Sequence, residues 1–283
     1  MESKNILLAG ATGYLGHYLA KELQNRGFKL TVILRDKKKL LSKNIVADKV
    51  YEGDLSDPNF YTSVMDGIDV VISTIGITRQ KDGKTYMDID YGVNHLLLQE
   101  ALKSGVKKFI YTSVLHGEKL KHLKICEAKE RFVEELQSSA IESLVIRPSG
   151  FFSDLEEILA AAKQGKSYLF GDGEKKLNPI HGADLASVIV NAIDIAKDTL
   201  EVGGPEVLTQ NQIVSMAYEV LKKEARIVHI PNFVKKIVLS LLYTFTTQKT
   251  YGSIEFFLTV IDLDMECEKF GTKTLREHFK TLS

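Results

Sequence analysis

The chain has 283 residues, 44% of them hydrophobic, and its 37 lysine and arginine residues equal its 37 aspartate and glutamate residues. This length and hydrophobicity are enough for one large core. Nucleic acid and anionic lipid attract proteins through a concentrated basic surplus, so the neutral balance argues against both as partners of the whole chain. The one dense basic run, Lys37 to Lys39, we interpret as a solvated helix start.

The two cysteines, Cys126 and Cys267, have neither CxxC nor Cys/His spacing. This spacing argues against a disulfide framework, predicts no metal site, and is typical of a reducing cytosol. The first residues lead directly into a strand-like segment without the apolar region of a signal peptide. No segment reaches the ~18 apolar residues that a spanning helix needs. We therefore expect a cytoplasmic protein with no transmembrane segment, and the sequence carries no signal for its oligomeric state.

The first half of the chain alternates apolar or β-branched runs with amphipathic stretches. Near-continuous apolar runs are typical of strands that are buried on both faces of a parallel sheet. The alternation predicts right-handed βαβ units, and hence an α/β, doubly wound parallel sheet of the NAD(P)-binding Rossmann type. Helices are expected over 14–26 and 93–103 and from Asp57-Pro58 onward. The expected strands are 5–9, 30–34, 49–52, 69–73, 107–112 and 143–147.

After Pro148 the pattern is less regular. We expect one compact unit over 1–283, with a Rossmann core of 1–150 and 175–200. A small, mostly helical substrate lobe would take 151–174 and 201–283. The apolar stretch 233–245 is short and interrupted by lysines, and we interpret it as a packed helix in preference to a membrane-surface helix. Helix-like segments are 153–164, 183–195, 210–223, 233–246 and 253–261, of which only 183–195 is expected to return to the main sheet.

The strongest single motif is the glycine-rich turn from Gly10 to Gly16, which follows a strand and opens a helix. Gly10 allows the tight turn, Gly13 lets the backbone approach a pyrophosphate, and Gly16 lets helix and strand pack closely. The helix N-terminus then offers N–H groups and a partial positive charge to phosphates. We expect a dinucleotide to be bound by Gly10, Thr12, Gly13, Tyr14, Leu15 and Gly16.

The end of the second strand indicates which dinucleotide is bound. NAD-binding proteins place a carboxylate there for the ribose 2′-hydroxyl, whereas a guanidinium suits the 2′-phosphate of NADP. Arg35 comes first in this chain, with Lys37 close behind. Asp36 stands about 20 residues after the glycine turn, which keeps NAD open as the less favoured alternative. We expect NADP, bound as NADPH.

Two later turns agree with a coenzyme groove. Asp54 and Leu55 follow the third strand, where such folds place a carboxylate against the adenine amino group. Thr74 and Gly76 follow the fourth strand, where small residues let the backbone pass under the coenzyme. Each turn alone would be ordinary, but their order along the chain makes them candidate binding residues.

Taken together, these motifs resemble the atypical short-chain dehydrogenase/reductase family over nearly the whole chain. The glycine spacing and Arg35 are similar to its NmrA-like branch, and other segments resemble divinyl chlorophyllide 8-vinyl reductases. The resemblance implies an NAD(P)-binding oxidoreductase, although related branches include assembly proteins that bind NADPH without known turnover. The segments are 127–129 with Phe132, 134–136, 147–152, 171–173, 179–180, 184–186, 203–205, 270–271 and 274–275.

The resemblance also implies catalytic residues, with one departure. The larger family places a proton-donating tyrosine four residues before a lysine that holds the nicotinamide ribose. Lys129 matches the lysine, but Ile125 occupies the tyrosine position and cannot transfer a proton. Lys129 could still bond the ribose, and near the positive nicotinamide its pKa could fall into a useful range.

Other candidates follow the fifth and sixth strands. Ser113 matches the family serine near the substrate carbonyl, and His116 on the next loop is a candidate proton donor. Pro148 and Phe151 are expected to border the nicotinamide. Asn94 begins a helix that in such enzymes contacts the central strands through water.

Two functions remain open from the sequence. The first is an NADPH-dependent oxidoreductase that transfers hydride to a small, apolar carbonyl or conjugated alkene. The second is a non-catalytic NAD(P)H-binding redox sensor or assembly factor, which Ile125 favours.

Overall fold

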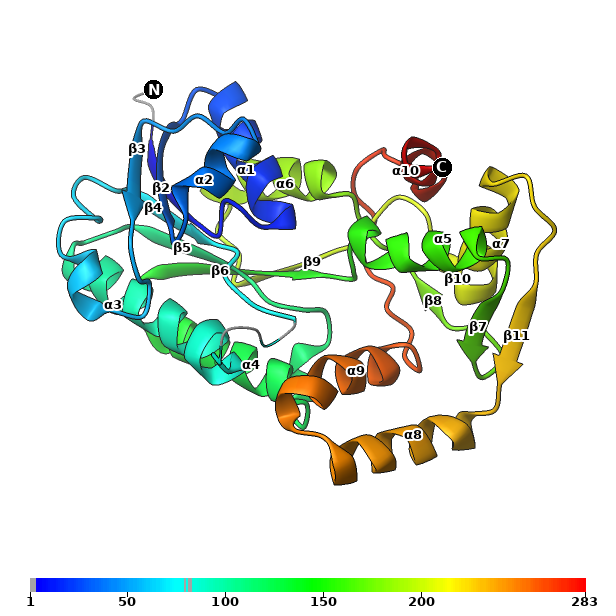
Figure 1. Ribbon diagram of the computed structural model, residues 1–283. Coiled ribbons are helices and arrows are strands. Elements are labelled where there is room, and N and C mark those ends of the chain that lie inside the picture. Colours follow the sequence, from blue (N-terminus) through cyan, green and yellow to red (C-terminus); the bar gives the residue numbers. More distant parts are fainter. Residues whose placement is uncertain (1–3, 79, 81–82) are drawn as a thin grey trace. The chain divides into compact units, whose positions relative to one another are not determined.

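The computed structural model describes residues 4–78, 80 and 83–283, and its first half alternates strands and helices as the hydrophobic pattern predicts (Figure 1). The strands are β1 (Asn5–Ala9), β2 (Lys29–Leu34), β3 (Lys49–Glu52), β4 (Val70–Ser73), β5 (Lys108–Thr112) and β6 (Glu142–Pro148). The helices are α1 (Tyr14–Asn25), α2 (Lys37–Ser42), α3 (Asn94–Lys103) and α4 (Lys124–Ser138). Farther along, α6 (Gly182–Asn191) and β9 (Thr199–Val202) complete the pattern.

The expected parallel sheet is confirmed. Seven strands pair in the order β3-β2-β1-β4-β5-β6-β9. Strand β1 is paired on both sides, with Leu8 opposite Val32 of β2 and Ile72 of β4. The strand order therefore reverses beside β1, and the carboxyl ends of β1 and β4 flank the crevice in which doubly wound folds bind ligands.

Helices cover both faces of this sheet, as Rossmann-type alternation requires. In Figure 1, α1 and α6 lie on one face, and α3 and α4 lie on the other. Leu7 and Val71 of the sheet pack with Leu97 of α3 and Phe132 of α4 in one buried cluster. Burial on both faces explains why the strand sequences are almost continuously apolar.

A π-helix, Met87–Val93, runs directly into α3. From the sequence we expect only the α-helix at this position. Likewise, the helix expected after Asp57 is a single 3₁₀ turn, Pro58–Tyr61, in which the Asp57 carboxylate accepts a hydrogen bond from the Asn59 N–H. Such short segments lack the repeated apolar spacing by which longer helices are recognised.

The chain divides into two compact units, Met1–Arg147 with Leu185–Leu200, and Pro148–Asp184 with Glu201–Ser283. The second unit contains helices, as expected, and also two small sheets that pair β7 with β11 and β8 with β10. Its elements are α5 (Glu156–Lys163), β7 (Ser167–Phe170), β8 (Lys176–Leu177), β10 (Leu208–Thr209), α7 (Gln210–Val220), β11 (Ile227–Ile230), α8 (Asn232–Phe245), α9 (Gln248–Val260) and α10 (Leu275–Leu282).

One expectation about the second unit is wrong. The stretch 233–245 forms helix α8, but it is not a packed helix, because Lys235 is its single buried residue. The core of this unit is instead formed by α5, α7 and α10, with Leu159, Ala217 and Phe279 among its buried members. Within the described residues, no helix combines the length and apolar character that crossing a membrane requires.

Candidate functional site

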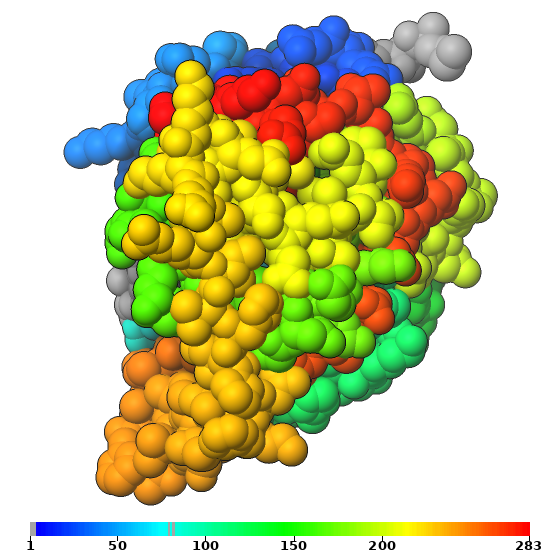
Figure 2. Space-filling view, turned by 90° about the vertical axis from the view of Figure 1, so that its right-hand side faces the viewer, coloured from blue at the N-terminus to red at the C-terminus, as the bar shows by residue number. Residues whose placement is uncertain are grey.

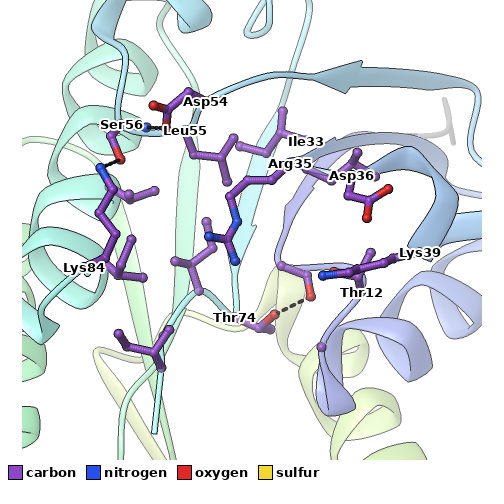
Figure 3. A pocket seen from close by; sticks show the side chains of 18 residues that line it. Thr12, Ile33, Arg35, Asp36, Lys39, Asp54, Leu55, Ser56, Thr74 and Lys84 are labelled. Atoms are coloured by element: carbon purple, nitrogen blue, oxygen red, sulfur yellow. Dashed lines mark hydrogen bonds between the residues drawn. The ribbon is translucent and has the colours of Figure 1, made fainter. Parts of the chain in front are cut away.

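A pocket of about 300 Å³ lies at the carboxyl ends of β1, β2 and β4 in the first unit (Figure 3). Its volume is at the lower end of the range for small-molecule sites. Several residues that the sequence predicts to bind a coenzyme line it, namely Gly10, Thr12, Gly13, Arg35, Asp54, Leu55, Thr74 and Gly76. The site therefore stands where the strand order reverses.

The glycine turn has the backbone geometry that its sequence predicts. Gly10 has a φ of +91°, a conformation that disfavours any side chain. The Gly13 N–H donates to the Gly10 carbonyl over 2.9 Å and closes the turn. A Cβ on Gly16 would stand 2.0 Å from the Gly10 oxygen, so only glycine allows α1 to approach β1. Because Gly13 caps α1 without a side chain, the positive end of the helix is left for an anion.

Cations gather at the end of β2. Arg35 is exposed and extends into the pocket, and Lys39 reaches in from α2 beside Thr12 (Figure 3). The Asp36 carboxylate also lines the pocket, but it accepts a hydrogen bond of 2.9 Å from the N–H of Lys38 and caps α2. Asp36, the side chain that could accept a hydrogen bond from the ribose of NAD, thus acts as the N-cap of α2.

The turn after β3 brings a carboxylate and a third cation to the pocket. Asp54 accepts a 2.9 Å hydrogen bond from the Ser56 N–H, and this bond, with the charges of Lys84 and Arg35, lowers the pKa of the Asp54 carboxyl. Lys84 lies 3.4 Å from the Ser56 hydroxyl (Figure 3). Ser56 and Lys84 are not predicted by the sequence, because they lie away from the strand ends on which that reasoning depends.

Thr74 and Gly76 join this pocket to a buried ion pair. The Thr74 hydroxyl donates to the carbonyls of Ala9 and Gly10, so it fastens β4 to the glycine turn. A Cβ on Gly76 would meet the Lys129 ammonium at 2.6 Å and Asp90 Oδ1 at 2.7 Å. Lys129 therefore lies directly behind the pocket wall at Gly76, although it does not line the pocket itself.

Lys129 is held by Asp90, a residue that sequence reasoning missed. Its ammonium lies 2.9 Å from Oδ1 of Asp90, which is fully buried in the π-helix. Among the described residues, no well-aligned hydrogen bond reaches this oxygen, so the contact is an ion pair by distance. Nothing in the periodicity of a helix marks one acidic residue as the partner of a lysine on another helix.

In the protein without coenzyme, the electrostatics of this pair favour a charged Lys129. Burial alone would lower the pKa of the Lys129 ammonium. The Asp90 carboxylate and the Tyr111 phenol raise it by more than burial lowers it, so the net shift of the pKa is upward. Burial also raises the pKa of Asp90, against the opposing charge of Lys129. An anion beside a buried ammonium favours its charged form, so Asp90 raises the pKa of Lys129 in the free protein. A fall of this pKa beside a bound nicotinamide stays a prediction.

Ser113 belongs to a second buried network. Its hydroxyl donates to the Glu130 carboxylate over 2.7 Å, and Arg147 holds the same carboxylate through two bonds of 2.8 and 2.7 Å. Ser113 and Glu130 are 6% and 2% exposed. In this arrangement the Ser113 hydroxyl is used as a hydrogen-bond donor to Glu130, a contact that the sequence did not indicate. His116 adopts a left-handed backbone conformation with φ of 57° and begins a 3₁₀ turn.

Asn94 ties the π-helix to the sheet directly. Its side-chain oxygen accepts a 2.5 Å hydrogen bond from Ser73, and its amide donates to the carbonyls of Ile75 and Asp90. From the sequence we expect this contact to pass through water. The direct bonds instead fix the end of β4 against the segment that carries Asp90.

Other predicted site residues lie elsewhere. Tyr14, Leu15 and Gly16 are the first residues of α1 and do not line the pocket. Pro148 and Phe151 belong to the second unit, and their roles stay predictions. Within the described residues no cluster of metal-binding side chains occurs.

Comparison with known proteins gives a family match. A model described as NAD(P)H-binding matches residues 10–196. The divinyl chlorophyllide a 8-vinyl-reductase of Arabidopsis thaliana is 28% identical over 84% of this chain and 62% of its own length. The photosystem II assembly factor Ycf39 of Guillardia theta is 28% identical over 80% of this chain and 73% of its own length. The chain thus spans about three fifths of the length of the vinyl reductases that it matches.

A solved structure shares the fold. The NADPH complex of the NADPH-dependent quinone oxidoreductase QOR2 from Escherichia coli superposes with a TM-score of 0.77. It covers 98% of this chain and 99% of that chain at 18% identity. At this identity the likeness establishes the architecture alone.

Proposed function

The chain belongs to the NAD(P)H-binding family and to the atypical short-chain dehydrogenase/reductases, and from this membership we propose that it is an NADPH-dependent reductase. The observation that carries the choice of coenzyme is the set of cations in the pocket. Arg35, Lys39 and Lys84 line the same pocket as the glycine turn, while the Asp36 carboxylate caps α2. A forked guanidinium suits a 2′-phosphate, and apolar Ile33, Leu55 and Ile77 suit an adenine ring.

The residues present fit the coenzyme. Gly10, Thr12 and Gly13 would hold the pyrophosphate at the positive end of α1. Lys129 would donate to the nicotinamide ribose at the Gly76 end of the pocket, with Asp90 keeping its ammonium charged and in place. Bound NADPH supplies the hydride. Tyr14, Leu15 and Gly16 would support the site by setting the approach of α1 to β1.

The proposed substrate is a small apolar molecule with a carbonyl or a conjugated alkene. The relatives named as vinyl reductases support an alkene, since a vinyl group is what their name says they reduce. Hydride would be added to the carbonyl or alkene carbon, and the adjacent oxygen or carbon would take a proton. Ile125 cannot supply that proton, so we propose His116 as donor, Ser113 near the carbonyl, and Pro148 and Phe151 beside the nicotinamide. We also propose a cytoplasmic location.

A second function has its own support. Ile125 is buried and has no ionisable proton to donate, and the Ser113 hydroxyl donates its hydrogen bond to Glu130. Both features suit a protein that binds NADPH without turnover, as an assembly factor or redox sensor would. The relative named as a photosystem II assembly factor agrees with this alternative.

One experiment separates these functions. NADPH and NADH are titrated by calorimetry, and NADPH oxidation is then followed with enones, quinones and aldehydes. Tight NADPH binding with turnover supports the reductase, and tight binding without turnover supports the alternative. Saturable binding of neither coenzyme, or tighter binding of NADH, contradicts the proposal of an NADPH site.

A further inference from the structure

The helical hairpin of α8 and α9 carries an apolar stripe on its surface. Phe233, Ile237, Leu241 and Phe245 follow one another at every fourth position of α8, so they share one side of the helix. They are 62%, 52%, 52% and 78% exposed. Large apolar side chains scattered singly over a surface are ordinary, but a contiguous stripe of this kind marks an interaction site.

The second helix of the hairpin also exposes apolar side chains. Ile254 and Phe257 of α9 are 37% and 39% exposed, and Gly252 is the single buried residue of that helix. Figure 2 shows the atoms of this hairpin, in orange, gathered at the surface. No residue of the hairpin belongs to the buried cluster that α5, α7 and α10 form within the described part of the second unit. The apolar stripe of α8 therefore stays exposed in the folded unit.

The hairpin also has a local excess of positive charge, although the whole chain is neutral. Residues 232–260 contain three lysines and one glutamate. Lys235 pairs with Asp262, and the glutamate, Glu255, accepts a 2.7 Å hydrogen bond from the Tyr243 hydroxyl. Lys236 and Lys249 are exposed and form no ion pair with any residue that the structure describes.

We propose that the α8–α9 hairpin binds the surface of an anionic lipid bilayer. The stripe of Phe233, Ile237, Leu241 and Phe245 enters the boundary between headgroups and acyl chains, and Lys236 and Lys249 contact the anionic headgroups. This is the chemistry of amphipathic helices that lie in the plane of a membrane. A second copy of the chain fits less well, because a symmetric contact between two hairpins brings like-charged lysines together. The inference does not depend on coenzyme binding.

The absence of tryptophan from the chain allows a direct test. Phe245→Trp places a single reporter at the most exposed position of the stripe. The variant is mixed with vesicles of equal parts phosphatidylcholine and phosphatidylglycerol, and with vesicles of phosphatidylcholine alone. We expect a blue shift of the emission, quenching by brominated acyl chains, and tighter binding to the anionic vesicles that weakens with salt.

Matched variants separate the apolar and charged contributions in co-sedimentation. Phe233→Ser with Leu241→Ser is expected to weaken vesicle binding by on the order of tenfold or more. Lys236→Glu with Lys249→Glu is expected to remove the preference for anionic vesicles. Tyr168→Ser, which changes a 58% exposed aromatic residue on β7 of the same unit, is expected to leave binding unchanged.

Two results would overturn the proposal. One is the absence of any emission shift and of co-sedimentation with either vesicle, while circular dichroism shows a folded protein. The other is a doubling of the mass by light scattering that the Phe233→Ser and Leu241→Ser changes abolish, since this would make a second copy the occupant of the stripe.

Discussion

The Lys129 ammonium on α4 lies 2.9 Å from Oδ1 of Asp90, a carboxylate that the π-helix before α3 buries completely. π-Helical segments within α-helices occur often at functional sites, because the wider turn re-aims its side chains. Here the segment is bonded through Asn94 to the end of β4. The pair stands directly behind Gly76, at the wall of the proposed coenzyme pocket. The ion pair that fixes Lys129 in the fold therefore also holds the side chain that we propose to bind the coenzyme.

Asp90→Asn is expected to lower both stability and the pKa of Lys129. Removing one partner of a buried ion pair leaves an uncompensated charge and typically costs about 3–5 kcal/mol of unfolding free energy. Without the carboxylate, burial dominates and lowers the pKa of the ammonium. Urea unfolding measures the loss of stability. The pH profile of NADPH binding measures the pKa change, because affinity should be lost at a lower pH in the variant than in the parent protein.

A surface pair on the same helix provides the control. Glu127→Gln breaks the exposed contact with Lys124, which is expected to cost at most about 0.5 kcal/mol. Asp90→Asn combined with Lys129→Met should be less destabilised than Asp90→Asn alone, because no unpaired charge remains. Equal costs for Asp90→Asn and Glu127→Gln would show that the buried pair has no special role.

Arg35→Ala is expected to reduce the preference for NADPH over NADH. A hydrogen bond to a charged group contributes about 1.5–3 kcal/mol, so NADPH affinity should fall roughly 10- to 100-fold while NADH affinity changes little. Lys37→Ala is the matched control, since Lys37 is exposed and close in sequence but does not line the pocket. Calorimetric titration of both coenzymes measures the ratio. An equal loss of both affinities would refute a role for Arg35 in 2′-phosphate recognition.

Two glycines of the same turn should respond differently to a methyl group. A Cβ on Gly16 would collide with the Gly10 carbonyl at 2.0 Å, so Gly16→Ala should lower the unfolding free energy by about 1–3 kcal/mol or more. Gly13 is exposed, with φ of −74°, and its Cβ would meet the same oxygen at 3.3 Å. Gly13→Ala should keep most of the stability and lose coenzyme affinity. Thermal unfolding and titration together decide this, and unchanged coenzyme affinity in Gly13→Ala would contradict it.

Cys126 predicts a pH dependence of stability. Burial raises the pKa of its thiol from an ordinary 9.0 to about 12, so the native state keeps a proton that the unfolded state loses between these values. The unfolded state then binds fewer protons, and the free energy of unfolding falls as pH rises above 9.0 by up to about 1.4 kcal/mol per pH unit. Cys126→Ala should remove this contribution.

The comparison requires urea unfolding of parent and Cys126→Ala from pH 8 upward, where the difference between them should shrink or reverse as pH increases. Thiol labelling adds an independent check, because Cys126 is 0% exposed and should react only after unfolding. Rapid labelling of Cys126 in the folded protein would contradict the buried, protonated thiol.

The amino-acid sequence by itself determined the parallel sheet and the glycine turn. Both depend on local signals, since strands buried on two faces must be continuously apolar, and the Gly10–Gly16 turn needs glycine where a Cβ would collide. The position of Arg35 in the pocket could be predicted for the same reason, because the end of a strand determines where the next side chain lies. The tertiary structure alone decided that Lys129 pairs with Asp90, that the Ser113 hydroxyl donates to Glu130 and that α8 is exposed. These depend on which faces of distant segments meet, and helical periodicity shows that a face is apolar but not what packs against it.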